Sequence, residues 1–147
     1  MHFDRGRAYS RAVPYRRQAA EHALQRHAYR EALGHLTRGL EMLQTLPPTP
    51  EYLQHELALQ TLLGTVLMVT EGYAPPGVEH AYLRARALCE HLGETSQLFP
   101  VLWGLLQVYA TRGDLHTARE LAEQLLDMAQ RTPTPAFPWR GHIMPWG

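Results

Sequence analysis

The stretch FPVLWGLLQVYATRGDLHTARELAEQLLDMAQR, residues 99–131, predicts two amphipathic helices joined by a tight polar turn. Apolar residues of its first half recur at the spacing of one helix face: Leu102, Leu105, Leu106 and Tyr109. Gly113 can adopt the left-handed conformation that ends a helix, and Asp114 can cap the next one by accepting a hydrogen bond from a free backbone N–H. The second half has a similar face: Ala118, Leu121, Ala122, Leu125 and Met128. The stretch therefore predicts a helical hairpin, which defines an architecture but not a chemical activity.

Composition places the chain among ordinary globular proteins. Its 147 residues suit one domain, and 45% hydrophobic with 19% charged residues is typical of that class. The N-terminal residues lack the apolar segment of a signal peptide, and no apolar run has the length of a membrane-spanning helix. Cys89 is the only cysteine, which excludes an internal disulfide and fits a reducing compartment. We therefore expect a cytoplasmic protein that does not contact a membrane.

Charge is distributed unevenly although the formal net charge is zero. Residues 1–40 carry eight arginines and three acidic residues, whereas residues 41–131 carry five arginines and eleven acidic residues. A basic N-terminal helix could meet nucleic acid or an acidic partner. The alternating signs of Arg17, Glu21, Arg30 and Glu31 instead favour a solvated helix face that complements acidic neighbours. The chain contains no lysine, so it lacks the lysine of a P-loop and any Schiff-base lysine.

A second copy of the hairpin pattern runs from about Pro14 to Leu46, with its turn at His27-Ala28. Its two apolar faces are Ala19, Ala20, Ala23 and Leu24, then Ala32, Leu36, Gly39, Leu40 and Leu43. The sequence Pro-Pro-Thr-Pro at 47–50 forces an extended linker, because a proline disfavours helix in the residue before it.

A third copy occupies residues 51–93. The apolar residues of its first helix are Leu59, Leu62, Leu63, Val66 and Leu67. Gly64 marks the point where a neighbouring helix must come close. The second helix has the best periodicity in the chain, with Val78, Ala81, Tyr82, Ala85, Leu88, Cys89 and Leu92 on one face. A connection with two prolines at 71–77 joins these helices, and Gly93 ends the second one.

Three hairpins, at about 14–46, 51–93 and 98–131, predict an all-α fold. Stacked hairpins cover each other's apolar faces and curl into an α-α superhelix with a concave surface suited to binding. Residues 1–12 are expected to form a basic segment before the repeat domain of residues 13–131. Residues 132–147 are expected to form a proline-rich tail.

The repeat positions resemble the tetratricopeptide repeat. Leu63, Gly64 and Leu67 look like the Leu-Gly and the following large residue of that motif. The first-helix, turn and second-helix positions are matched by Leu105, Tyr109, Gly113, Asp114 and Ala118. Two features depart from the pattern: Gln60 and Leu102 replace the expected tryptophan, and the repeat-end proline is displaced to Pro47 and Pro133. The resemblance implies a helical-repeat protein that binds other polypeptides.

A narrower resemblance is to the helical C-terminal region of large bacterial signalling ATPases, in which a nucleotide-cyclase or protein-kinase domain can precede the NTPase domain. It rests on HLTRGLEMLQTLP at 35–47, ELALQTLLGTVLMVTEGY at 56–73 and RARALCEHLGETSQLFPVLWGL at 84–105. It implies a regulatory segment whose partner is a protein, a peptide or the NTPase domain of the same polypeptide. None of that family's nucleotide-binding or cyclase residues has a counterpart here.

The sequence contains little that indicates a catalytic or a metal-binding site. His27, Glu31 and His35 are each four residues apart, which would align them for a metal on a continuous helix, but the turn at His27-Ala28 breaks that alignment. No serine lies in a GxSxG motif, and His55 lacks the second histidine of HExxH. Cys89 lies in an apolar series, which favours a buried packing thiol over a nucleophile. We expect no enzyme activity, no cofactor and no metal.

The predicted binding surface consists of first-helix residues that face away from each hairpin core. These are Arg17, Glu21 and Gln25, then Thr61, Thr65 and Met68, then Trp103 and Gln107. Trp103 lies outside the apolar stripe of its helix, where an exposed aromatic would be a binding anchor. The alternative is that Trp103 packs under the neighbouring hairpin. The alternative function is nucleic-acid binding by the Arg-rich N-terminal hairpin.

The tail TPTPAFPWRGHIMPWG, residues 132–147, departs from the helical pattern because its four prolines preclude a long helix. Truncation or a shift of the reading frame is the favoured interpretation, and a natural proline-rich end is the alternative. Without a polar capping helix, the third hairpin should expose part of the apolar surface formed by Leu121, Leu125, Leu126 and Met128, and self-associate or fray. A fold-back of the tail through Phe137, Trp139 and Trp146 is the alternative.

Overall fold

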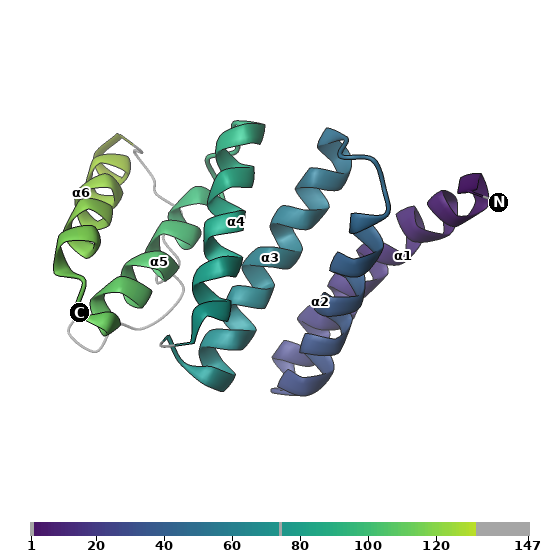
Figure 1. Cartoon of the computed structure of the whole chain (residues 1–147), viewed down its shortest axis with the longest axis horizontal. Helices are drawn as coiled ribbons and strands as arrows, with labels where there is room; N and C mark the ends of the chain where they lie inside the picture. The colour runs from purple at the N-terminus through teal and green to yellow at the C-terminus, as the bar shows by residue number, and fades with distance from the viewer. Residues whose placement is uncertain (1, 74, 132–147) are drawn as a thin grey trace.

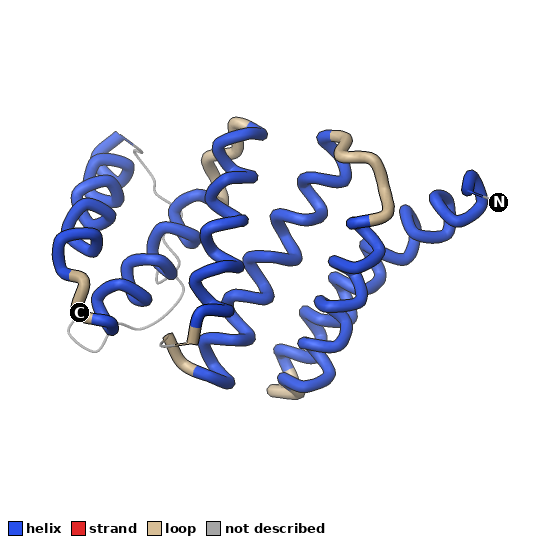
Figure 2. Tube along the Cα trace, in the orientation of Figure 1, coloured by secondary structure: helices blue, strands red, loops and turns tan. Residues whose placement is uncertain are grey.

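The computed structural model describes residues 2–73 and 75–131, with side chains from residue 8 onward. The described residues form helices joined by short loops, with no strand among them (Figures 1 and 2). They are α1 (His2–Gln25), α2 (Tyr29–Gln44), α3 (Pro50–Glu71), α4 (Pro76–Leu92), α5 (Leu98–Arg112) and α6 (Leu115–Arg131). None of the helices in the described ranges combines the length and the hydropathy that a membrane span requires.

The helices follow one another across the molecule, from α1 at one end to α6 at the other (Figure 1). The pairs α1/α2, α3/α4 and α5/α6 form hairpins, and α2 and α4 pack on the first helix of the next hairpin. The first helices α1, α3 and α5 also contact one another in sequence, whereas α2, α4 and α6 make no mutual contacts among the described residues. This arrangement confirms the predicted all-α, α-α superhelical fold.

The helix ends follow from local sequence. Gly113 has φ of 81° and ends α5, and the Asp114 carboxylate accepts a hydrogen bond from the Thr117 backbone N–H at 3.2 Å. Gly93 ends α4 with φ of 67°. Both glycines therefore confirm the predicted left-handed stops. At the start of α3, the Thr49 hydroxyl accepts a bond from the Tyr52 N–H at 3.3 Å.

Helix α1 is longer than the sequence pattern indicated. It begins at His2, whereas the first hairpin was predicted to begin near Pro14, which lies inside the helix. Proline is favoured in the first turn of a helix, and inside a helix it lacks the backbone N–H donor. The sequence therefore predicted a helix start near Pro14, whereas the helix continues through it. The turn itself lies at the predicted place, with His27 at φ of 60°. The tail at 132–147 lies outside the described residues.

Buried apolar side chains form two clusters. The first joins α1 and α2 to one face of α3, through residues such as Ala20, Ala32, Leu36, Leu59 and Val66. The second joins α3, α4, α5 and α6, and it includes most of the predicted apolar face of α4. Two residues of that face differ: Ala81 is buried but lies outside the cluster, and Leu92 is only half-buried. Helix α3 therefore contributes to both clusters and links the first hairpin to the rest.

The predicted face of α5 was too narrow. Leu102 and Leu105 are buried as expected, but Leu106 and Tyr109 are only half-buried. Four further residues are buried: Phe99, Val101, Gly104 and Val108. Because α5 packs against α4 on one side and α6 on another, it buries more than the single face that periodicity detects.

The ring of Tyr82 lies at the crossing of three helices. A Cβ atom added to Gly104 of α5 would lie 2.6 Å from Cζ of Tyr82, and one added to Gly64 of α3 would lie 2.8 Å from the same atom. Neither distance is physically tolerable, so both positions need glycine while the tyrosine is present. The prediction that a neighbour approaches closely at Gly64 is confirmed.

A polar clip joins the start of α4 to the end of α5. The Tyr109 hydroxyl donates to one oxygen of Glu79, and Arg112 Nη1 donates to the other, each at 2.6 Å. The bonds from Tyr109 and Arg112 lower the pKa of Glu79. Burial, together with the bond to Glu79, raises the pKa of Tyr109 to about 12.

We predict that Gly104→Ala destabilises the protein. Overpacking against Tyr82 costs about 1–3 kcal/mol, which exceeds the roughly 1 kcal/mol that alanine gains over glycine in a helix. Urea denaturation measures the difference. Gly34→Ala is the matched control, because no atom lies within 4 Å of its added Cβ and the change should stabilise α2. In a chain that already carries Tyr82→Leu, Gly104→Ala should no longer have the overpacking cost. If Gly104→Ala costs as much stability in that chain as in the parent chain, the Tyr82 ring is not the obstacle.

We predict that Cys89 resists thiol reagents in the native state. Its side chain is 1% exposed, and burial raises its pKa to about 11, so little reactive thiolate forms at neutral pH. Absorbance during labelling with an aromatic disulfide should show a slow reaction that accelerates strongly in denaturant. Equal rates in both conditions would contradict the burial of this thiol.

We predict that the Glu79 clip stabilises the fold above about pH 4.3, the ordinary pKa of glutamate, and loses its effect as the pH falls through the lowered folded pKa. At pH 7, Glu79→Gln should therefore melt at a lower temperature than the parent chain. The gap should close as the pH falls from about 4.3 through the lowered pKa of Glu79. A gap that stays constant over this range would show that ionised Glu79 contributes nothing.

Candidate interaction surfaces

The eight residues predicted to form a binding surface all lie on first helices. Arg17, Glu21 and Gln25 belong to α1, Thr61, Thr65 and Met68 to α3, and Trp103 and Gln107 to α5. Contacts between α1 and α3 and between α3 and α5 place these helices side by side. The predicted residues therefore lie on neighbouring elements, as their repeat positions imply.

Most polar groups of this first-helix surface already have intramolecular partners. Arg17 Nε donates to Glu21 at 3.0 Å. The Thr61 hydroxyl donates to the Leu57 carbonyl at 2.9 Å, and the Thr65 hydroxyl donates to the Thr61 carbonyl at 3.1 Å. These bonds satisfy the side chains within their own helices and reduce what they offer to a ligand.

Trp103 follows the packing alternative. It is half-buried and packs against the cluster shared by the second and third hairpins, as Met68 does. Gln107 is also half-buried, and Gln25 is exposed. Trp103 is therefore partly exposed on the first-helix surface and partly packed against the core.

A groove of about 500 Å³ lies between α2 and α4 and over α3. Its apolar lining consists of Leu40, Leu43, Leu46, Pro47, Pro48, Tyr52 and Leu53. The walls stay apart because α2 and α4 do not touch, while α3 packs against both and forms the floor. This volume lies within the range of pockets that hold small ligands or a few residues of a peptide.

Polar groups complete the lining of this groove. Gln44 and Gln60 bring side-chain amides, each with donors and an acceptor. Arg84 donates to both oxygens of Glu56, through Nε at 2.7 Å and Nη2 at 2.9 Å. The bond to Glu56 raises the pKa of Arg84. Because this pairing uses Nε and Nη2, the third guanidinium nitrogen can donate to a ligand.

The sequence pattern did not predict this groove. Periodicity assigns each helix an apolar face, but it does not report how far apart two second helices lie. One sequence signal was present, the Pro47-Pro48 connection, which lines the groove. In the structure, Leu40 is only half-buried although it belongs to the predicted apolar face of α2.

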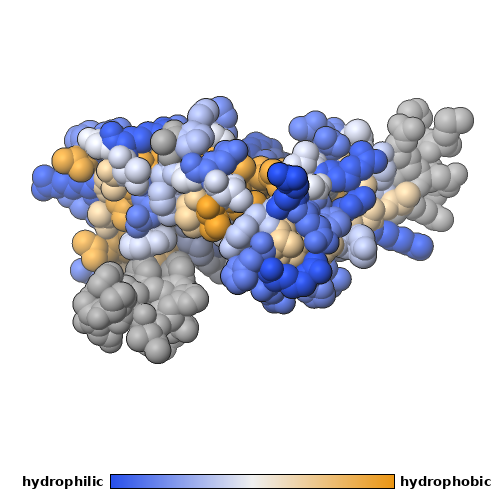
Figure 3. Space-filling model, turned by 90° about the horizontal axis from the view of Figure 1, so that it is seen from below, coloured by the Kyte–Doolittle hydropathy of each residue, from blue (hydrophilic) through white to orange (hydrophobic). Residues whose placement is uncertain are grey.

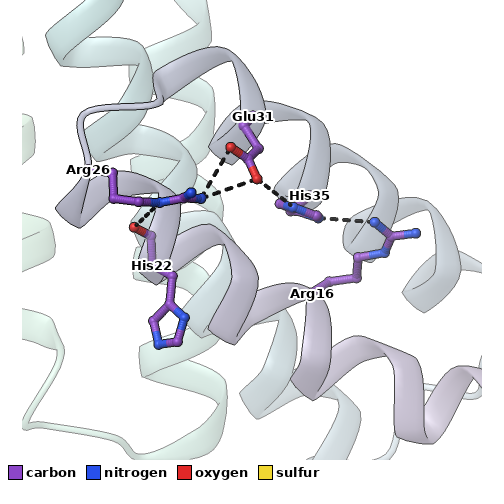
Figure 4. Close-up of polar contacts among 5 residues, drawn as sticks. All are labelled: Arg16, His22, Arg26, Glu31 and His35. Atoms are coloured by element: carbon purple, nitrogen blue, oxygen red, sulfur yellow. Dashed lines mark hydrogen bonds and ion pairs between the residues drawn. The ribbon is translucent and has the colours of Figure 1, made fainter.

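A chain of polar contacts covers the outside of the first hairpin (Figure 4). Arg16 Nη1 lies 3.0 Å from Nδ1 of His35, whose other ring nitrogen lies 3.9 Å from Glu31. Arg26 donates to both oxygens of Glu31 at 3.2 Å. Because arginine can only donate, Nδ1 of His35 is the acceptor and Nε2 carries the proton toward Glu31. These contacts join α1 to α2.

Other arginines of this hairpin have acidic partners, since Arg17 pairs with Glu21 and Arg38 pairs with Glu41. This pairing matches the interpretation of a solvated face with interleaved charges. His27 lies in the turn, where Nδ1 is 3.0 Å from the Tyr29 hydroxyl, so the helical alignment with Glu31 and His35 is broken as expected. No group of three metal-ligating side chains comes together in the described ranges.

The surface changes in character along the array. In the view of Figure 3, hydrophilic residues dominate the α1–α2 end, whereas hydrophobic residues reach the surface in the middle and toward the α5–α6 end. Among the side chains that the structure describes, five large hydrophobic ones are exposed: Tyr15, Val69, Leu83, Leu115 and Leu126. Leu115 and Leu126, both on α6, are 71% and 63% exposed.

Comparisons of the chain with protein-family models, with curated proteins and with solved structures gave no match.

Proposed function

We propose that this chain is a non-catalytic protein-interaction module that binds a segment of another polypeptide in the groove between α2 and α4. The observation that supports the proposal is the groove itself, in which a continuous apolar lining is combined with amide and guanidinium groups. Apolar side chains of a ligand would fill the space around Leu40, Leu46 and Tyr52. Most affinity in protein complexes comes from a few such buried contacts.

The polar lining favours a peptide over a purely hydrophobic ligand. An extended peptide carries a backbone donor and acceptor at nearly every residue, and these need partners when they leave water. Gln44 and Gln60 can satisfy both kinds of group, and the remaining nitrogen of Arg84 can donate to a backbone carbonyl or a carboxylate. The bound segment would therefore be extended, apolar at alternate positions, and would place an oxygen acceptor near Arg84.

The proposed family is the tetratricopeptide class, as a regulatory segment of a cytoplasmic bacterial signalling ATPase. The hairpins, the glycine-Asp turn at Gly113-Asp114 and the buried alanines Ala32, Ala81 and Ala118 support the first part of this proposal. The second part rests on the resemblance of residues 35–47, 56–73 and 84–105 to that family. The bound segment would then belong to the NTPase domain or to a protein that regulates it.

Peptide selection tests the groove. Random peptides displayed on phage would be selected on the immobilised full chain, and their affinity would be measured by fluorescence polarisation. Leu46→Asp places an unpaired charge in the apolar lining and should weaken selected peptides by about tenfold or more, because burying an unpartnered charge is costly. Replacing both Gln44 and Gln60 with alanine should also weaken binding.

The matched control is Gln107→Ala on the predicted first-helix surface. Peptides that lose affinity for this variant but bind Leu46→Asp normally would move the site to the first helices. Failure to select any peptide, together with binding of a fluorescent oligonucleotide whose affinity falls steeply with salt, would favour the nucleic-acid alternative instead. Circular dichroism melting curves confirm that each variant is folded.

A further inference from the structure

The two second helices α4 and α6 occupy equivalent positions in successive hairpins. Aligning Ala81 with Ala118 places Val78, Ala85 and Cys89 of α4 at the positions of Leu115, Ala122 and Leu126 of α6. The three α4 residues are at most 1% exposed, because they lie in the cluster that α4 shares with α5. Their equivalents on α6 have no following helix among the described residues, and the two leucines are 71% and 63% exposed.

One stripe along α6 combines three exposed residues with the half-buried Ala122. Leu115, Arg119, Ala122 and Leu126 are separated by four, three and four residues, which is the spacing of a single helix face. The order of these separations is the same from either end of the helix, and the first and last residues of the stripe are leucines. An antiparallel copy of the stripe therefore places Leu115 against Leu126 of the second copy, and Leu126 against its Leu115.

Charge and size also fit such a pairing. The small side chain of Ala122 lies near the centre of the stripe, where two helices must approach most closely. Arg119 bonds to Glu123 of its own helix at 3.2 Å. In an antiparallel pair, each Arg119 also lies near Glu123 of the other helix, so the central charges attract across the interface.

At the opposite end of the array, the side chains described from residue 8 onward offer no matching apolar surface. The exposed face of α1 carries Arg11, Tyr15, Gln18 and His22 with the same spacing. Stacking α6 of one copy on α1 of the next would cover two leucines with mainly polar groups. A closed pair through α6 is therefore favoured over an open head-to-tail filament.

We propose that two copies of this chain associate through α6, as an antiparallel helix pair that buries Leu115 and Leu126 of both copies. This inference deepens the proposed interaction function by naming a second copy as one partner, and it uses a surface distant in sequence from the groove. A single helix pair buries less than the about 1,200 Å² of a standard interface, so the dimer is expected to be weak.

Sedimentation equilibrium of the full chain over a range of concentrations tests the dimer. The mass should rise from monomer to dimer and not beyond it. Leu115→Glu and Leu126→Glu should each keep the chain monomeric, because the new carboxylates would be buried without partners. Leu83→Glu is the matched control: Leu83 is a 39% exposed leucine of α4 outside the stripe, and this variant should still dimerise.

Cysteine cross-linking tests the orientation. Leu115→Cys mixed with Leu126→Cys should form a disulfide-linked heterodimer, whereas each variant alone should cross-link much more slowly. Cys89 does not compete in this assay because it is buried. Efficient cross-linking of Leu126→Cys with itself would indicate a parallel pair and overturn the proposed arrangement.

A chain that stays monomeric at all concentrations, or a Leu126→Glu variant that still dimerises, would also overturn the proposal. Peptide binding in the groove is a separate readout. The Leu126→Glu monomer should bind selected peptides with unchanged affinity. Loss of the dimer and loss of the groove function can thus be distinguished.

Discussion

The packing of the Tyr82 ring between Gly64 and Gly104 determines how the second and third hairpins meet. The ring belongs to α4, and it occupies the space that a side chain would need at Gly64 of α3 and at Gly104 of α5. The tyrosine hydroxyl lies 3.5 Å from the Thr65 hydroxyl, next to one of these glycines. A single side chain thereby fixes the approach of three helices. Because interiors are closely packed, a shift of any one of these helices would have to move the other two.

The first hairpin is attached differently. Its interface with α3 uses aliphatic contacts, in which Gly39 of α2 admits the Leu59 side chain; a Cβ on Gly39 would lie 3.0 Å from a Leu59 methyl carbon. Leu59 belongs to the first-hairpin cluster and Leu57, two residues earlier, belongs to the other cluster. Helix α3 is therefore apolar around most of its circumference. The groove lies where α3 supports α2 and α4 without bringing them together, so its floor is a helix held by both clusters.

The sequence predicted the fold where one face of a helix decides the packing. On α4, the periodic residues are the buried ones, and the turn chemistry of Gly113 and Asp114 placed the last hairpin turn correctly. The sequence pattern was less informative where a helix contacts several neighbours, since Val101 and Val108 of α5 lie outside the predicted stripe but are fully buried. Trp103 illustrates the same limit, because its burial depends on the elements that pack around α5. The groove could not be predicted either, because it results from the separation of two helices and not from the pattern of one.

Equivalent positions in the hairpins have different environments according to their place in the array. Leu40 of α2, Cys89 of α4 and Leu126 of α6 share one register position, and they are half-buried, buried and exposed in turn. All three are hydrophobic, so their chemistry does not explain the difference. Cys89 is covered because α5 packs closely on α4, Leu40 lines the groove that α4 leaves open, and Leu126 has no following helix among the described residues. The apolar surface accessible to a partner therefore arises where the repetition of the hairpin is interrupted: at a widened step between two second helices, and at the last helix that the structure describes.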